Sequence, residues 1–336
     1  MKERHVTIPL FIPHMGCPHT CVFCNQRVIS GHSRFDPADI EKEIEAVLAT
    51  IRPENRCEIA FFGGSFTGID RTLMIDLLTR AQKYIERGLV ESIRLSTRPD
   101  YIDDGVLTVL RAYGVGTVEL GLQSFSDRVL SASSRGHTAE CARRACELVK
   151  EYGFDLIGQM MIGLPLSDGE SERMTAQTIC DLGADGARVY PTVVFRDTEL
   201  ARMSENGDYT PLTEEAAVER CADVLEILDA HGVPCIRVGL CATENLNDPE
   251  TAIGGANHSA IGELAMGEVF YRRICRALDE KPSLGDTVTV RVPRGAVSKA
   301  VGQNRKNKLK ICEKYGLKRI KVLEKNEIIG YNIILE

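Results

Sequence analysis

Stretches rich in β-branched and aromatic residues alternate with stretches of helical periodicity along the first 240 residues. The apolar stretches are 6–12, 57–62, 91–97, 114–122, 154–165, 186–194 and 233–240, and the helical ones are 38–51, 73–88, 104–114, 138–153, 170–183 and 214–232. Several helical stretches end in glycine, as helix C-termini often do. Regular strand–helix alternation predicts a parallel sheet with crossover helices. The sequence therefore predicts an α/β fold built on a full or partial (β/α) barrel of the TIM type.

Unusual motifs follow the predicted strands at their carboxyl ends. The cysteine motif GCPHTCVFCNQ (16–26) follows the first strand, and the next four strands are followed by GGSFTG (63–68), STRPD (96–100), GLQSF (121–125) and GLP (163–165). Functional residues of a (β/α) barrel lie at the carboxyl ends of its strands. We therefore expect all five motifs on one rim.

The composition is that of an ordinary globular protein, with 336 residues, 43% hydrophobic and 26% charged. No apolar run approaches the roughly 20 residues needed to cross a bilayer. The apolar part of the opening MKERHVTIPLFIP is too short for a signal peptide. We therefore expect a cytoplasmic protein with no membrane partner, in which most of the 12 cysteines are reduced thiols.

Charge is distributed unevenly along the chain. Residues 286–336 hold 12 Lys and Arg against 5 Asp and Glu, whereas the remainder holds 29 against 43. The segment KPSLGD (281–286) is the best linker candidate. We expect residues 1–280 to form the barrel with its C-terminal extension, and residues 286–336 to form a small basic domain. A basic unit on an acidic body favours an anionic partner, most often nucleic acid.

Cys17, Cys21 and Cys24 have C-x3-C-x2-C spacing. Thiolates bind zinc or iron–sulfur clusters. A structural zinc site commonly takes four protein ligands as two CxxC-like pairs, and no second pair occurs here. The other nine cysteines are scattered and are expected to be small buried residues. The trio therefore offers three ligands and leaves one coordination position open.

This cysteine spacing in the first βα loop, together with GGSF after the second strand, resembles the radical S-adenosylmethionine (SAM) superfamily. The resemblance implies that Cys17, Cys21 and Cys24 hold three irons of a [4Fe–4S] cluster and that SAM chelates the fourth. Reductive cleavage of SAM then gives a 5′-deoxyadenosyl radical that abstracts a hydrogen atom. A reductant such as flavodoxin or ferredoxin is the implied electron donor.

The resemblance also implies a set of SAM contacts. An aromatic residue between two cluster ligands packs near the adenine in such loops, and Phe23 has that place here. Gly63 and Gly64 let the backbone approach the methionine moiety closely. The implied cofactor-binding residues are Phe23, Gly63, Gly64, Ser65, Ser96, Gln123, Arg135 and Gln159.

Two segments, 120–140 and 157–165, are similar to the branch that contains oxygen-independent coproporphyrinogen oxidase and the catalytic subunit of Elongator. In that branch a Gln in the QSF motif and an Arg twelve residues later contact SAM, and these positions are Gln123 and Arg135. Two positions depart from the porphyrin enzymes. Ser96 stands where they have a SAM-binding Glu, and Gln159 stands where they have an Asp.

Residues 5–275 resemble the Elongator side of this branch, through IPLFIPHMGCPHTCVFCN, STRPDYID and GGANHSAIGELAMGE. The Elongator catalytic subunit modifies wobble uridine in tRNA, but nothing here is long enough to be its acetyltransferase domain. The resemblance therefore implies a radical SAM enzyme that acts on RNA, tRNA above all, with no DNA partner. A radical SAM enzyme for a small metabolite such as a tetrapyrrole, and a non-catalytic Fe–S RNA-binding protein, are the alternatives.

The segment 295–324 resembles a small α+β module of the KH type, in which a GxxG loop clamps backbone nucleotides. Arg305 replaces the second glycine of that loop. Arg305, Lys306 and Lys308 are candidate phosphate contacts, and a solvated basic face is the alternative. Two further residues are candidate catalytic groups: Tyr190 after the sixth strand, which is otherwise a core tyrosine, and His258 in NHSAIGEL.

Overall fold

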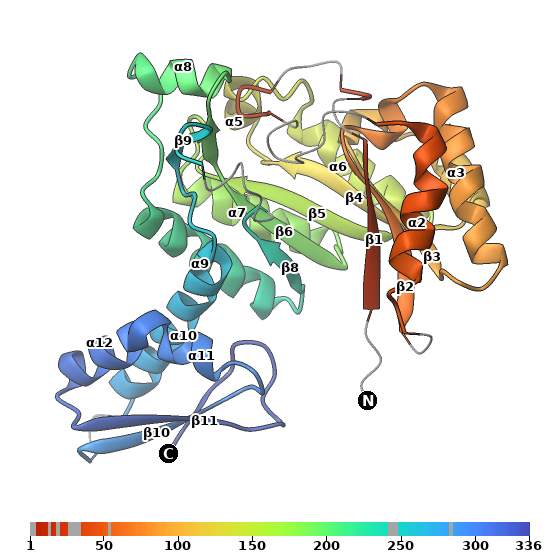
Figure 1. Cartoon of the computed structure of the whole chain (residues 1–336). Helices are drawn as coiled ribbons and strands as arrows, with labels where there is room; N and C mark the ends of the chain where they lie inside the picture. The colour runs from red at the N-terminus through yellow and green to blue at the C-terminus, as the bar shows by residue number, and fades with distance from the viewer. Residues whose placement is uncertain are drawn as a thin grey trace.

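The computed structural model describes residues 5–12, 15–17, 21–25, 35–52, 55–240, 248–281 and 285–336. Seven strands form one sheet in the order β1-β2-β3-β4-β5-β6-β8, and every neighbouring pair is parallel. The strands are β1 His5–Ile12, β2 Arg56–Gly63, β3 Ser92–Thr97, β4 Val115–Gln123, β5 Asp155–Ile162, β6 Gly186–Pro191 and β8 Cys235–Val238. Over the described residues β1 and β8 do not pair, so the curved sheet is a partial barrel, as predicted (Figure 1).

Helices connect the strands and cover one face of the sheet (Figure 1). They are α2 Ile40–Leu48, α3 Arg71–Glu86, α4 Asp104–Ala112, α5 Asp127–Ala132, α6 Ala139–Glu151, α7 Gly169–Asp181 and α9 Glu214–Ala230. Single 3-10 turns occupy Pro37–Asp39, Phe66–Gly68, Pro99–Tyr101 and Gln303–Arg305. Five of the connecting helices begin at a side chain that accepts a backbone N–H from the first turn, namely Asp70, Asp103, Thr138, Asp168 and Thr213. Such caps satisfy donors that the helix itself leaves free.

The two faces of the sheet differ in chemistry. Ile8, Leu10 and Ile59 point to the helix-covered face and join the main apolar core. Because successive side chains of a strand alternate between faces, residues such as Glu58 and Arg94 point to the opposite, inner face. The inner face is therefore polar and the outer face apolar.

One predicted strand is divided in two. The stretch 186–194 forms β6 and then a short β7, Val193–Phe195, which leaves the main sheet and pairs antiparallel with β9, Ala252–Gly255. The break falls at Thr192, whose N–H and hydroxyl both donate to the Ile162 carbonyl at 2.8 Å. Three helices were not among the elements expected from periodicity: α5, α8 (Glu199–Glu205) and α10 (Ile261–Asp279).

The C-terminal unit has a strand–helix–helix–strand–strand order. It consists of β10 Thr287–Val292, α11 Val297–Val301, α12 Lys306–Tyr315, β11 Arg319–Glu324 and β12 Ile334–Leu335. Strand β10 lies between β11, to which it is parallel, and β12, to which it is antiparallel. The apolar core of this unit includes Phe270, Ile274 and Leu278 of α10. The division into 1–280 and 286–336 stays a prediction, and residues 282–284 of the expected linker lie outside the described part.

Within the described ranges, no helix is long and apolar enough to cross a membrane.

Candidate active site

The loop after β1 is bound to two other segments. The Val22 N–H donates to the Ser133 carbonyl at 3.2 Å, and the Val22 carbonyl accepts from the Leu200 N–H at 2.8 Å. Val22 is buried with Leu200 and Tyr209, and Phe23 packs against this cluster. The cysteine loop is thus held between the end of α5 and the start of α8, and a contact of Phe23 with adenine stays a prediction.

The three predicted ligand thiols all lie in this loop. Cys21 is 6% exposed, whereas Cys17 and Cys24 are half-buried. Among the described residues, no three His, Cys, Asp or Glu side chains converge on one metal-ion position. In a [4Fe–4S] cluster each thiolate binds its own iron. Three ligands of one cluster therefore do not need to share an ion position.

Glycines bring the first two rim loops into backbone contact. A Cβ on Gly64 would lie 2.0 Å from the Met15 carbonyl oxygen, and a Cβ on Gly16 would lie 2.1 Å from that of Ser65. The Gly64 and Ser65 N–H groups donate to the Ile12 and Met15 carbonyls at 3.0 and 3.1 Å. Gly64 is therefore required by the protein's own packing. The predicted approach of Gly63 and Gly64 to SAM remains a prediction.

The second and third loops are joined by hydroxyl groups. Ser65 Oγ lies 2.8 Å from Thr97 Oγ1, which lies 2.6 Å from Thr67 Oγ1. Ser65 Oγ also accepts the Arg98 N–H at 3.2 Å. Because Ser65 is fully buried, its side chain is committed to this network.

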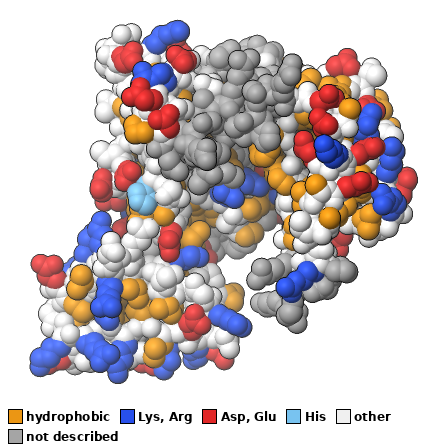
Figure 2. All heavy atoms as spheres, viewed as in Figure 1, with side chains coloured by type: hydrophobic (Ala, Val, Ile, Leu, Met, Phe, Trp, Pro, Cys, Tyr) orange, Lys and Arg blue, Asp and Glu red, His pale blue; other side chains and the backbone are white. Residues whose placement is uncertain are grey.

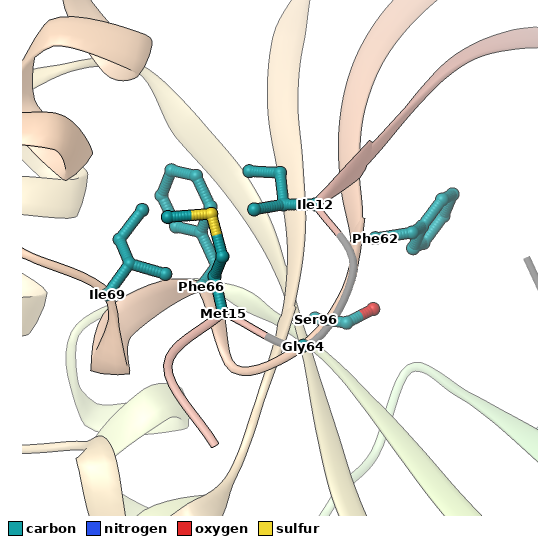
Figure 3. Close-up of a pocket in the computed structure, with 7 residues that line it drawn as sticks. All are labelled: Ile12, Met15, Phe62, Gly64, Phe66, Ile69 and Ser96. Carbon is teal, nitrogen blue, oxygen red and sulfur yellow. The ribbon is translucent and has the colours of Figure 1, made fainter. Parts of the chain in front are cut away.

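A small cavity lies beneath the second loop (Figure 3). Four apolar side chains gather on one side of the Gly64 backbone, and Phe62 and Ser96 point to the other side. The lining residues are Ile12, Met15, Phe62, Gly64, Phe66, Ile69 and Ser96. The half-buried Ser96 is thus on the inner face of the sheet.

Gln123 and Gln159 form a reciprocal amide pair. Gln123 Nε2 donates to Gln159 Oε1 at 2.9 Å, and Gln159 Nε2 donates to Gln123 Oε1 at 3.0 Å. Gln123 has a φ of 65° at an irregularity in the β4–β5 register. Residues other than glycine rarely adopt this backbone conformation, and such strain concentrates at functional sites. The amide pair brings together two of the predicted SAM contacts, Gln123 and Gln159.

Arg135 lies between the cysteine loop and this amide pair. Its Nη1 donates to Cys21 Sγ at 3.5 Å and its Nη2 donates to the Gly121 carbonyl at 2.7 Å. Arg98 donates two hydrogen bonds of 2.8 Å to Asp100 and one of 2.6 Å to the Arg135 carbonyl. Both guanidinium groups keep one buried nitrogen, Arg98 Nη1 and Arg135 Nε, with no hydrogen-bond partner in the described part of the chain.

Burial changes the acidity of the neighbouring groups. Burial raises the pKa of the Cys17 thiol, while the charges of Arg135 and Arg98 oppose this rise. Burial also lowers the pKa of His137 to about 4, helped by the charge of Arg135, so its imidazole is neutral at pH 7. For Asp100, burial acts to raise the pKa, but the hydrogen bonds and charge of Arg98 bring it below its usual value.

A ladder of charged side chains crosses the inner face below the rim. Glu119 binds Arg94 Nη1 at 2.9 Å and Arg188 Nε at 2.9 Å. Arg94 also contacts Glu58 at 2.9 Å. The candidate catalytic residue Tyr190 lies beside this ladder, with Arg188 Nη1 3.5 Å from its hydroxyl.

The other candidate catalytic residue, His258, has a local structural contact. Its Nδ1 accepts the Ala260 N–H at 3.0 Å, just before α10 begins. Nδ1 is therefore the hydrogen-bond acceptor in this turn. A catalytic part for His258 or Tyr190 stays a prediction.

Sequence reasoning did not select Arg98, Asp100, His137 or the charged ladder. Arg98 and Asp100 lie in the STRPD motif, which the sequence analysis used for its place after a strand and for the Elongator resemblance, without giving either residue a role. The ladder had a signal: Glu58, Arg94, Glu119 and Arg188 are charged residues inside otherwise apolar strands. Buried charges are rare unless they are paired.

The candidate RNA contacts lie apart from this rim, in the C-terminal unit. Arg305 and Lys306 are exposed and Lys308 is half-buried. All three lie at or just after the turn between α11 and α12.

Two family models match the chain in succession. The radical SAM superfamily matches residues 11–178, and the radical SAM C-terminal domain matches residues 184–269. The first match alone covers half of the chain.

Individual relatives agree with these family matches. A tRNA uridine(34) acetyltransferase of Methanocaldococcus jannaschii is 29% identical over 60% of this chain and 45% of its own length. Elongator complex protein 3 of Homo sapiens is 32% identical over 58% of this chain and 40% of its own length. The matched region thus spans less than half of these relatives. The solved structure of Methanocaldococcus infernus Elp3 shares the fold, with a TM-score of 0.62 and 21% identity over 84% of this chain and 64% of that one.

The rim residues suit the cofactors of this superfamily, a [4Fe–4S] cluster and SAM. Three thiols lie between residues 17 and 24 with no disulfide among the described cysteines. Two buried guanidinium groups next to them keep unpartnered nitrogens, which suit an anionic neighbour. The chain belongs to the radical SAM superfamily, and a [4Fe–4S] cluster and SAM are its cofactors.

Proposed function

We propose that this radical SAM enzyme modifies RNA, and tRNA in particular. Superfamily membership supports an enzyme. The observation that carries the choice of substrate is the similarity to a tRNA uridine(34) acetyltransferase and to Elongator complex protein 3.

Different rim residues would hold the cluster and SAM. Cys17, Cys21 and Cys24 would hold the cluster. When bound, the cluster and SAM supply one-electron cleavage of SAM and abstraction of a hydrogen atom. The Gln123–Gln159 amide pair offers hydrogen-bonding groups to the polar parts of SAM, and Gln123 is held in a strained backbone conformation beside Arg135.

Other rim contacts keep this arrangement rigid. The backbone contact at Gly64 and the hydroxyl network of Ser65 tie three loops together. Rigid placement matters because a reactive group must be held close to the atom that it attacks.

The turn between α11 and α12 supports an RNA partner. Asn307 Nδ2 donates to the Gly267 carbonyl of α10 at 2.8 Å, which fixes the turn on the body of the protein. Gly302 approaches Asn307 so closely that a Cβ would lie 2.9 Å from its side chain. Asn304 and Arg305 then adopt left-handed φ values of 50° and 62°, with their side chains exposed. Exposed cations on a fixed turn are suited to RNA phosphates.

The rest of the C-terminal unit adds to this charge. Figure 2 shows Lys and Arg side chains over this unit at the lower left. Two of its five carboxylates are already paired, Asp286 with Lys318 and Glu336 with Arg291. The exposed Arg305 and Lys306 have no ion pair within the described residues.

The position of this unit favours a large substrate. Figure 1 shows the unit at the lower left, away from the upper end of the sheet where β1 ends and the cysteine loop follows. A folded tRNA is large enough to contact both the rim and this unit.

The test is 5′-deoxyadenosine formation by anaerobically reconstituted protein with SAM and a reductant. We expect formation to rise when bulk tRNA is added. Formation that is indifferent to tRNA would contradict the proposal and would favour a small metabolite such as a tetrapyrrole. Cluster binding without any SAM cleavage would favour a non-catalytic Fe–S RNA-binding protein.

A further inference from the structure

We infer that Arg98 and Asp100 form a positioning pair that sets the reduction potential of the cluster and holds the segment that carries Arg135. The inference rests on the cofactor set of the superfamily and does not depend on the substrate. It concerns two residues that neither the cysteine spacing nor the relatives' names assign to a role.

The geometry makes Arg98 a link between three rim segments. Its side chain is 3% exposed, directly after β3, and its two hydrogen bonds to Asp100 form a bidentate pair. A third hydrogen bond, 2.6 Å long, reaches the carbonyl of Arg135. Its backbone N–H donates to Ser65 Oγ of the second loop. The planar guanidinium binds both Asp100 oxygens and the Arg135 carbonyl at once, a fixed geometry that a lysine ammonium does not provide.

Arg98 also lies within electrostatic range of the cluster ligands. Arg135, whose carbonyl Arg98 holds, donates to Cys21 Sγ at 3.5 Å. The charges of both arginines act on the Cys17 thiol. The Nη1 atom of Arg98 is buried and has no hydrogen-bond partner among the described residues. One buried nitrogen is therefore available to an anionic group in the adjacent site.

The sign of the effect follows from charge. Three thiolates and a [4Fe–4S] core carry net negative charge, which grows by one unit on reduction. A buried cation nearby stabilises the reduced state, and a carboxylate opposes it. The Asp100 side chain is 23% exposed whereas that of Arg98 is 3% exposed, so water screens the carboxylate more than the guanidinium. The pair therefore raises the reduction potential, with Arg98 dominant.

The test compares Arg98→Gln with Asp100→Asn in redox titrations of the reconstituted protein followed by electron paramagnetic resonance. We expect Arg98→Gln to lower the midpoint potential, because it leaves a carboxylate near the cluster. Asp100→Asn is expected to raise it, because it leaves the guanidinium uncompensated. A tenfold change in the ratio of reduced to oxidised cluster, the order expected, is about 59 mV for one electron.

The controls separate this role from a merely structural one. Arg80→Gln and Asp76→Asn change an ion pair on the outer helix α3, with the same 2.8 Å contact, and should leave the potential unchanged. Iron and sulfide content checks that each variant holds its cluster. Arg98→Lys keeps the charge and should preserve most of the potential while loosening the bidentate contact. If Arg98→Gln does not fold, the rise in potential expected of Asp100→Asn still tests the inference.

Midpoint potentials that shift in opposite directions in Arg98→Gln and Asp100→Asn support the inference. Shifts of both variants in the same direction, or no shift in clusters of full iron content, would overturn it. Neither result bears on tRNA stimulation, which is measured separately, so failure of this inference and failure of the proposed function are distinguishable.

Discussion

At the residue scale, single atoms decide whether the rim loops can meet. The Gly64 and Gly16 backbones each touch a carbonyl oxygen of the other loop, so neither position has room for a Cβ. Of the two, Gly64 was expected to contact SAM. The structure adds a reason inside the protein, because the loop that carries the cysteines is aligned by the loop that carries Gly64.

Gly64→Ala should disrupt this contact. Its Cβ would meet backbone rather than a flexible side chain, and overpacking of this kind costs about 1–3 kcal/mol. We expect a lower free energy of unfolding and less iron bound after reconstitution. Gly105→Ala is the matched control, because that glycine lies in α4 with only the Asp103 side chain nearby. The free energy of unfolding of Gly105→Ala should rise by up to about 1 kcal/mol. If Gly64→Ala and Gly105→Ala lost equal stability, the close contact at Gly64 would not be the cause.

At the element scale, the strands are joined across the inner face by charge. Side chains of β2, β3, β4 and β6 form the ladder Glu58–Arg94–Glu119–Arg188. A second contact comes from β1, where the Thr7 hydroxyl donates to Glu58 at 2.7 Å. A sheet that does not close lacks hydrogen bonds between its first and last strands. The ladder gives such a sheet cross-strand contacts on the face that helices do not cover.

Glu119→Gln should therefore destabilise the sheet. Arg94 and Arg188 would each lose their shared carboxylate while remaining 14% exposed. Removing one partner of a buried ion pair typically costs about 3–5 kcal/mol. Denaturant unfolding followed by circular dichroism measures the loss.

The control for this prediction is Glu91→Gln. Glu91 pairs with Arg56 at 3.5 Å, and both side chains are at least half exposed. Such a surface pair contributes about 0–1 kcal/mol. If Glu119→Gln and Glu91→Gln had the same free energy of unfolding, the ladder would not stabilise the sheet.

At the scale of the whole molecule, α10 joins the partial barrel to the C-terminal unit. Its residues complete the apolar core of that unit, and its Gly267 carbonyl holds Asn307 beside the basic turn. The turn is thus oriented by the body of the enzyme. Under the proposed function, an RNA bound at the turn would therefore be presented to the rim in a defined direction.

Arg305→Gly tests whether the turn binds RNA through charge. Arg305 has a left-handed backbone conformation, which costs a side-chain-bearing residue about 1 kcal/mol or more. We expect Arg305→Gly to raise stability, to weaken tRNA binding several-fold, and to reduce the salt slope of binding by about 1. Arg144→Gln, an exposed cation on α6, is the control and should leave binding unchanged. Tighter binding by Arg305→Gly would mean that the turn clamps RNA by close backbone approach instead.

Much of the fold followed from local patterns. Six expected helical stretches correspond to α2, α3, α4, α6, α7 and α9, with ends that differ by a few residues. The seven expected strands also occur, although β6 and β7 divide one of them. The expected helical stretches did not include α5 and α8, which are short, or the long α10, whose first residues were noted only for the Elongator resemblance. Local periodicity also missed the place where β7 leaves the sheet, because the cause is a contact between Thr192 and Ile162 from another strand.

The candidate site shows the same division between local and long-range information. The sequence by itself determined the cysteine spacing, the glycine motif and their order after the strands, because these lie in short continuous segments. Only the tertiary structure decided that Gln123 pairs with Gln159, that Arg98 holds Asp100 and the Arg135 carbonyl, and that Glu119 is shared by two arginines. Such contacts depend on strand register and on burial, which arise when distant segments pack together and which no single stretch of sequence contains.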